Sequence, residues 1–292
     1  MWNFPSWLQI PLAQWIDTIM HWVLVHWGGF FDVVGNIFLH IMLPIERFLL
    51  WLPWWVVVLA VGFVAWRAMR SKWAGLIMMV FLIIIGSFGH TTGTNYWDAA
   101  MSTLAIVISS VIISLVIGIP TGILMATNDR FEQIIRPMLD AMQTMPSFVY
   151  LIPALMLFGL GMVPAVFATI VYAAPPVIRL TNVGIRQVSP AVIEAAQAFG
   201  SSKRQILFDV QIPLAIPSIM VGINQTTMMA LAMVVIASMI GARGLGLEVL
   251  LAINRIQIGR GFEAGLSIVL LAIIIDRITN AMASRQQYDL HK

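Results

Sequence analysis

Charged residues are scarce in this sequence of 292 residues: Asp, Glu, Lys and Arg make up only 10% of it. A soluble globular protein carries about 25%. Hydrophobic residues supply 60% of the chain, and the mean hydropathy is +0.92. So few charges cannot cover a water-exposed surface or form a basic face for DNA or RNA. The composition excludes a soluble enzyme, a disordered chain and a nucleic-acid-binding protein, and predicts an integral membrane protein.

Cysteine is absent, which excludes disulfides, thiolate metal ligands and cysteine nucleophiles. Lysine occurs only as Lys72, Lys203 and Lys292, and none of these follows a glycine. A nucleotide-hydrolysing loop needs a glycine-rich turn ending in Gly-Lys, so we expect no ATPase site in this chain. The five histidines are scattered, so we also expect no metal site. No acid, base or metal ligands converge at one depth of the predicted membrane, so we expect no catalytic residue and no cofactor in this chain.

Long apolar segments are abundant, and a membrane-spanning helix needs about 20 such residues. Seven candidates lie at about residues 51–66, 74–88, 100–126, 139–158, 163–179, 214–240 and 262–281. The sequence therefore predicts an all-α, polytopic membrane protein with about seven transmembrane helices.

Basic residues predict the orientation of these helices, because cytoplasmic loops are enriched in Lys and Arg. With the N-terminus outside and the C-terminus inside, only four of the 16 Lys and Arg residues fall outside: Arg47, Arg243, Arg255 and Arg260. The other twelve lie on or near the cytoplasmic side. The opposite orientation would invert this ratio.

The N-terminal region differs from the rest of the chain. Residues 12–27 and 30–43 each place apolar residues at helical spacing between polar ones, so we expect two amphipathic helices in the membrane interface. All eleven tryptophans lie between Trp2 and Trp97, and indole rings favour the headgroup level. We therefore divide the chain into a peripheral part, residues 1–97, with these helices and two transmembrane helices, and a packed core, residues 98–292.

Prolines interrupt three predicted spans: Pro120, Pro146, Pro153, Pro175 and Pro176. A proline inside a helix removes a hydrogen bond and kinks the helix. Two interpretations stay open: irregular packing, or broken helices that line a path, where freed carbonyls find water or protein.

The longest predicted cytoplasmic connection, residues 180–213, contains the signals of a short helix. Ser189 can cap it, Pro190 suits its first position, and Gly200 suits its C-terminal end. A second helical segment begins near residues 201–202, and we expect it to end by Pro213.

One face of the short helix carries apolar residues at spacings of three and four: Val192, Ala195, Ala196 and Phe199. Two adjacent alanines permit close approach to another surface. The helix is either a solvated loop helix or a docking helix for a soluble partner, which would supply the energy that this chain lacks.

The same loop resembles the signature of membrane subunits of bacterial ABC importers. That signature is Glu-Ala-Ala, three residues, Gly, nine residues, a branched aliphatic residue, any residue, and then an aliphatic residue followed by Pro. It corresponds here to Glu194, Ala195, Ala196, Gly200 and Pro213. This chain has Val210 and Ile212 where the family usually has Ile and Leu. The resemblance implies a type I ABC-importer-like transmembrane fold, with the loop as the coupling helix in a cleft of the ATP-binding subunit.

Further segments, at residues 139–151, 174–181, 222–226 and 230–239, resemble the subfamily that imports glycine betaine, proline betaine, choline or carnitine. The resemblance implies a permease subunit that translocates glycine betaine or a related quaternary ammonium osmolyte across the bacterial cytoplasmic membrane. It also implies a homodimer in membrane lipid, an ABC ATPase subunit that carries ATP and Mg, and an extracytoplasmic substrate-binding protein.

Four polar residues are candidates for lining the translocation path: Tyr150, Asn224, Gln225 and Ser238. Each could equally bond a neighbouring helix. One alternative function is an ABC importer permease for another small solute, such as an amino acid, choline or carnitine. An ATP-independent secondary transporter is a further alternative, but it would predict buried ionisable residues or an inverted repeat, and neither is visible.

Overall fold

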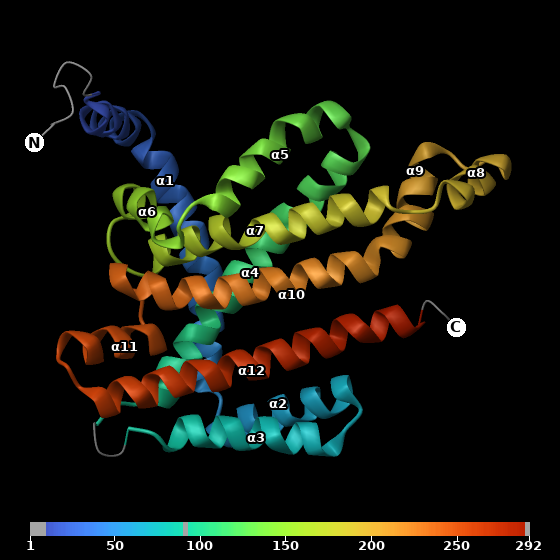
Figure 1. Ribbon diagram of the computed structural model, residues 1–292. Coiled ribbons are helices and arrows are strands. Elements are labelled where there is room, and N and C mark those ends of the chain that lie inside the picture. Colours follow the sequence, from blue (N-terminus) through green and yellow to red (C-terminus); the bar gives the residue numbers. More distant parts are fainter. Residues whose placement is uncertain (1–9, 90–92, 290–292) are drawn as a thin grey trace, which may run out of the picture.

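The computed structural model describes residues 10–89 and 93–289 as a bundle of helices, with no strand among them (Figure 1). The helices are α1 (Leu12–Trp51), α2 (Trp54–Met69), α3 (Lys72–Ser87), α4 (Tyr96–Thr127), α5 (Asp129–Thr144), α6 (Leu151–Phe158), α7 (Met162–Arg186), α8 (Pro190–Ala198), α9 (Lys203–Gln205), α10 (Ile212–Ala237), α11 (Leu245–Asn254) and α12 (Ile258–Asp289). Two 3₁₀ turns, Ser147–Tyr150 and Ser238–Ile240, and one π-helical turn, Ile206–Gln211, complete the description.

Helix α7 forms the centre of the bundle, packed between α4 and α10. Small residues make this packing close. A Cβ on Gly122 of α4 would lie 2.6 Å from the carbonyl oxygen of Ile178, and one on Gly222 of α10 would lie 3.1 Å from the Cα of Val177. Since apolar burial drives helix association only weakly inside a membrane, close backbone contacts of this kind hold the helices together.

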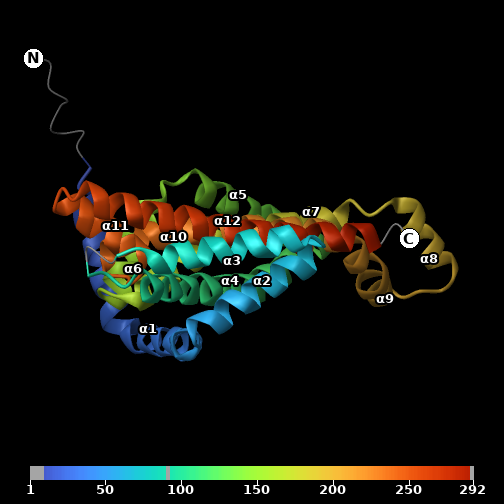
Figure 2. The same ribbon diagram turned by 90° about the horizontal axis from the view of Figure 1, so that it is seen from below.

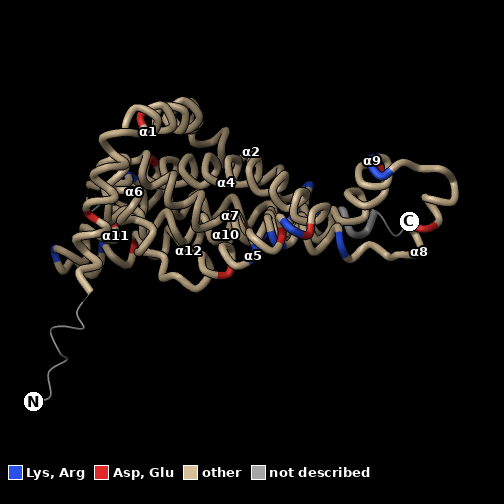
Figure 3. Tube along the Cα trace, turned by 90° about the horizontal axis from the view of Figure 1, so that it is seen from above, with Lys and Arg blue, Asp and Glu red and all other residues tan. Residues whose placement is uncertain are grey.

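The long helices run between two ends of the bundle, and different short elements lie at each end (Figures 1 and 2). One end carries α8, α9, the turn between α2 and α3, and the C-terminal end of α12. The opposite end carries α6, α11 and the start of α1. Charged residues gather mostly towards these two ends, which leaves the middle of the bundle largely uncharged (Figure 3).

Helix α1 is one continuous helix of 40 residues, so the prediction of two separate interfacial helices is wrong. Gly28 and Gly29 lie between the two predicted segments, but a glycine costs a helix only about 1 kcal/mol. Ending the helix there would leave backbone hydrogen-bonding groups without partners in apolar surroundings, which costs several times more free energy than the glycines do. Helix α1 is apolar and long enough for a span, yet it runs across the direction of α7, α10 and α12 (Figure 1).

Only the second half of α1 packs tightly against the bundle. Met42 is 1% exposed, and the buried carboxylate of Glu46 accepts a hydrogen bond from Ser102 Oγ of α4 at 2.8 Å. Helices α2 and α3 pack on each other and on α12. The division of the chain near residue 97 stays a prediction, and residues 1–9, 90–92 and 290–292 of the two parts lie outside the described residues.

Each of the seven predicted spans coincides with a helix or a helix pair. Among the described residues, however, five helices are long and apolar enough to cross a membrane, or six if one bent pair is counted as a single span. Helices α2 and α3 are apolar but have only 16 residues each. Predicted span 139–158 is the bent pair: α5 ends at Thr144, Pro146 is extended, and the chain turns by 113° into Ser147–Phe158. Proline disfavours a helical residue before it, which explains the break.

Pro213 does not end a helix, contrary to the prediction. The chain stays helical from Lys203 to Ile240, and Pro213 occupies the first turn of α10. A proline in an α-helix clashes with the carbonyl four residues earlier. Here that carbonyl, of Asp209, belongs to the π turn Ile206–Gln211, whose wider spacing accommodates the ring.

Candidate functional site

Helix α8 projects beyond the rest of the bundle and contains no buried residue (Figure 1). Its bounds, Pro190–Ala198, agree with those predicted from Ser189, Pro190 and Gly200, although the Ser189 side chain makes no capping hydrogen bond. On its apolar face, Phe199 is 91% exposed and Val192 is 41% exposed. An exposed phenyl ring that projects from the bundle is a surface that a partner can cover.

The C-terminal end of α8 is closed by backbone hydrogen bonds. Gly200 has a φ of +84°, which an L side chain rarely adopts. The amide of Gly200 donates to Gln197 O at 2.9 Å, and the amide of Ser201 donates to Ala196 O at 3.1 Å. Glu194 and Ala195 are exposed and Ala196 is partly exposed, so the predicted coupling residues of α8 lie at the surface.

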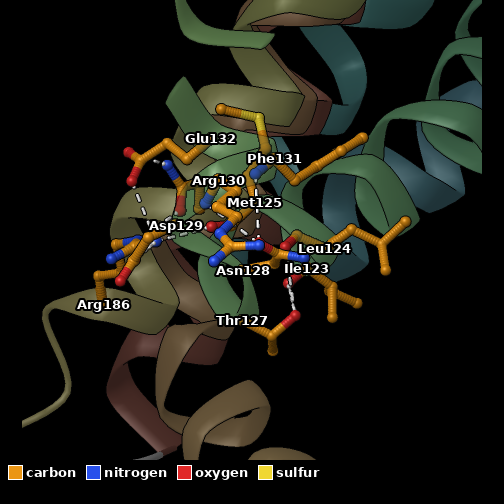
Figure 4. Close-up of polar contacts among 11 residues, drawn as sticks. Ile123, Leu124, Met125, Thr127, Asn128, Asp129, Arg130, Phe131, Glu132 and Arg186 are labelled. Atoms are coloured by element: carbon orange, nitrogen blue, oxygen red, sulfur yellow. Dashed lines mark hydrogen bonds and ion pairs between the residues drawn. The ribbon is translucent and has the colours of Figure 1, made fainter. Parts of the chain in front are cut away.

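A polar network joins the end of α7 to the junction between α4 and α5 (Figure 4). Arg186 is the last residue of α7, and its guanidinium lies 2.7 Å from Asp129 and 3.0 Å from Glu132, both in the first turn of α5. Arg186 also donates to the carbonyl oxygen of Met125 in α4 at 2.8 Å. Asn182 bridges the network, since it donates to Glu132 at 2.9 Å and accepts from Arg186 at 3.0 Å.

This network fixes α5 to the helix that leads into α8. The pair with Glu132, whose side chain is 20% exposed, is the better shielded one, because Asp129 is 79% exposed and its charge is screened by water. A second ion pair, Arg179 with Asp140 at 2.5 Å, joins the other end of α5 to α7. A cleft of about 280 Å³ lies between α5 and α7. Two sets of ion pairs therefore join α5 to α7, one near each end of α5.

Sequence reasoning missed this network. Asn128 caps α5 by accepting hydrogen bonds from the amides of Arg130 and Phe131, and acidic residues follow in the first turn. Those features signal the start of a helix. Nothing in the local pattern links them to Arg186, which is more than 50 residues away in the chain.

The four predicted path residues have different surroundings. Tyr150 is 6% exposed and donates to Met142 O, and Ser238 is 4% exposed and donates to Val235 O at 2.7 Å. Asn224 accepts a hydrogen bond from Thr279 of α12. Gln225 is exposed on α10. Three of the four therefore form hydrogen bonds within the chain, and the role of all four in transport stays a prediction.

The bundle has the fold of a type I ABC importer transmembrane subunit. It superposes on a chain of the MetNI methionine ABC transporter in an inward-facing conformation with a TM-score of 0.60, over 68% of this chain and 98% of that one. The two sequences are 20% identical, so this likeness shows the fold alone.

The chain belongs to the family described as binding-protein-dependent transport system inner membrane component, whose model matches residues 118–288. It is 47% identical to the glycine betaine/carnitine transport permease protein GbuB of Listeria monocytogenes, over 96% of each chain. It is 46% identical to the glycine betaine/proline betaine transport system permease protein ProW of Escherichia coli, over 94% of this chain and 75% of ProW. It is thus a multi-pass inner membrane transport component, and these relatives are named permeases rather than enzymes.

Proposed function

We propose that this protein is the permease subunit of an ATP-driven importer that translocates glycine betaine or a related quaternary ammonium compound. The observation that carries the proposal is the 46–47% identity to permeases named for glycine betaine, which extends over at least 94% of this chain. Energy would come from a separate ABC ATPase subunit that carries ATP and Mg. The substrate would arrive on an extracytoplasmic binding protein.

The docking element for the ATPase would be α8, with Glu194, Ala195, Ala196 and Gly200. Its exposure, its ordered C-terminal end and its position outside the bundle support this role. Pro213 would contribute through the π turn that connects the loop to α10.

The orientation would be N-terminus outside and C-terminus inside. Support comes from the two ends of the bundle. The end with α8 also carries the turn between α2 and α3, where the basic residues Arg70 and Lys72 lie (Figure 1). The positive-inside bias favours that end as cytoplasmic.

The chemistry of the substrate fits an uncharged path. A quaternary ammonium ion donates no hydrogen bond and is held by aromatic faces or attracted by carboxylates. Charges are concentrated towards the ends of the bundle, so the middle offers few carboxylates that would trap such a cation (Figure 3). Selection of the substrate would then depend on the binding protein, and Tyr150, Asn224, Gln225 and Ser238 would affect the rate of passage.

Uptake of radiolabelled glycine betaine tests the proposal. Cells that depend on this permease should accumulate the label only when the ATPase and the binding protein are both produced. Excess unlabelled carnitine serves as the comparison, because GbuB is named for both compounds. Uptake of a neutral amino acid that excess glycine betaine does not inhibit would contradict the substrate class, and would leave the family membership intact.

A further inference from the structure

A buried ion pair joins α11 to the first turn of α12, at the end of the bundle opposite α8 (Figure 1). The Nε and Nη2 atoms of Arg260 lie 3.0 Å and 2.6 Å from Oε2 of Glu248. Both side chains are only 14% exposed. Opposite charges that are shielded from water attract each other more strongly than exposed ones, so this pair holds the two helices together.

A second carboxylate lies within reach of the same guanidinium. Glu263 follows Arg260 by three residues in α12, and residues at that spacing are neighbours on a helix surface. The Oε2 atom of Glu263 is buried and has no hydrogen-bond partner among the described residues. Tyr96 of α4 is 1% exposed and interacts electrostatically with both carboxylates and with Arg260, so the four groups form one cluster. A buried carboxylate oxygen without a partner is costly, and the Arg260 guanidinium can satisfy it.

The backbone of the turn between α11 and α12 is strained at Ile256, which has a φ of +53° and is 84% exposed. The amide of Ile256 donates to Ile253 O at 3.1 Å, and the amide of Gln257 donates to Ala252 O at 2.8 Å. These two bonds form a Schellman motif, in which the left-handed position after the helix is usually a glycine. A β-branched residue is strained there, because its Cβ lies too close to the following carbonyl oxygen.

The first two turns of α12 contain three glycines: Gly259, Gly261 and Gly265. Glycine is the least favourable residue in a helix interior after proline. A Cβ on Gly259 or Gly265 would meet no atom within 4 Å, so close packing does not explain these two glycines. A helix start of this composition can change its conformation locally while the rest of α12 stays in place.

We infer that the turn between α11 and α12 is a latch with two states. In the closed state, which the structure has, Arg260 binds Glu248 and Ile256 is strained. In the open state, Arg260 binds Glu263, the first turn of α12 separates from α11, and Ile256 leaves the left-handed region.

The ion pair favours the closed state of this latch and the backbone strain favours the open one. The difference in free energy between the two states is therefore small, and a ligand or partner that prefers one state can shift the equilibrium. The inference rests on the proposed function only in taking transport to require an opening at this end of the bundle.

Disulfide trapping across the latch tests the inference, since the natural chain has no cysteine. A Cβ on Gly261 would lie 3.4 Å from the Cβ of Ala252, close to the separation found in disulfides. In membranes that hold the full complex, the double variant Ala252→Cys/Gly261→Cys should cross-link on mild oxidation and lose uptake. A reductant should restore uptake. Each single cysteine variant is the control and should keep its uptake after oxidation.

The rate of cross-linking in the double-cysteine variant measures the latch without reference to the substrate. Adding Glu248→Gln should lower this rate severalfold at rest, because Arg260 loses its partner on α11. Trapping the complex with ATP, vanadate and the binding protein should also lower the rate severalfold. Adding Glu263→Gln should prevent the effect of trapping, because Arg260 then has no second carboxylate to bind.

Ile256→Gly tests the strain. Glycine adopts the left-handed conformation freely, so this variant should favour the closed state by roughly 5- to 30-fold and slow uptake, while cross-linking stays fast.

The latch is overturned if the fully cross-linked complex takes up glycine betaine as fast as the reduced one, or if neither Glu248→Gln nor trapping lowers the rate of cross-linking. An equal effect of trapping with and without Glu263→Gln would overturn the exchange of partners. Absence of betaine uptake by the reduced complex, with the expected changes in cross-linking, would instead contradict the proposed substrate and leave the latch standing. The two failures are therefore distinguishable.

Discussion

At Gly200, the backbone angle φ restricts substitution more than contacts with neighbouring atoms do. A Cβ at this position would meet no atom within 4 Å, so a larger residue would not clash. Its φ of +84° nevertheless costs a β-branched residue about 1–2 kcal/mol. We expect Gly200→Val to displace the end of α8 and to reduce ATP-dependent uptake by roughly 5- to 30-fold, the population change that corresponds to that cost.

The matched control for this variant is Gly93→Val. Gly93 also has a positive φ, +67°, and open space around it, but it lies in the connection between α3 and α4, at the end of the bundle away from α8. Uptake should stay near that of the natural chain. An equal loss in both variants would mean that backbone strain acts through stability rather than through α8.

Individual residues show which features could be predicted from the sequence and which could not. Ser189, Pro190 and Gly200 give the bounds of α8 because capping signals act within a few residues. The bond between Glu46 and Ser102 depends on how α1 packs across α4, which no local pattern records. Buried polar pairs formed over long chain distances therefore escape sequence reasoning, whereas helix ends do not.

At the scale of the element, α8 provides a test of docking. Ala196 lies on the apolar face of α8, whereas its neighbour Gln197 lies on the opposite face and is exposed. We expect Ala196→Arg to abolish uptake without unfolding the bundle, because a long charged side chain keeps a partner surface at a distance. Uptake and co-purification of the ATPase subunit measure the two parts of this effect.

Gln197→Arg adds the same charge on the other face of α8 and serves as the control. It should retain both uptake and bound ATPase. If Ala196→Arg and Gln197→Arg behaved alike, the effect would come from charge in the loop, and the apolar face would have no special role.

Helices were predicted well where a segment is apolar along its whole length. They were predicted less well where packing against other helices determines a bend or a helix end. The spans 100–126 and 163–179 fall within α4 and α7. The bend after α5 depends on Pro146, which the sequence marked, but its angle of 113° depends on the helices that receive α6. The continuity of α1 could not be predicted, because a Gly-Gly pair is compatible with both a break and a helix.

For the whole molecule, the two ends of the bundle provide a test of orientation. Gln197 in α8 and Asn254 at the end of α11 are both exposed, and they lie at opposite ends (Figure 1). In intact cells, Asn254→Cys should react with a membrane-impermeant maleimide and Gln197→Cys should not. Both should react after the membrane is opened.

This pair contains its own control, because the natural chain lacks cysteine and gives no background. Labelling of Gln197→Cys from outside would reverse the orientation and remove α8 from the side where an ATPase works.

Whole-molecule architecture followed from the sequence only in outline. Composition predicted a helical membrane protein, and the loop signature led to the fold class that the structure has. The central place of α7 could not be predicted, because the same apolar spacing describes a helix covered by lipid or by its own chain. Only the packing of α7 against α4 and α10 shows which helix is at the centre.

The π turn at Ile206–Gln211 has a mechanical consequence. A π turn holds one residue more than an α-helical turn, so the helix carries a spare residue at this point. If the π turn moved along the chain, each residue that it passed would rotate about the helix axis by about 100°, which is the rotation per residue in an α-helix. The helical segments before and after the π turn would keep their directions. Such a movement would turn a few side chains between α8 and α10 about the helix axis without bending the helix on either side.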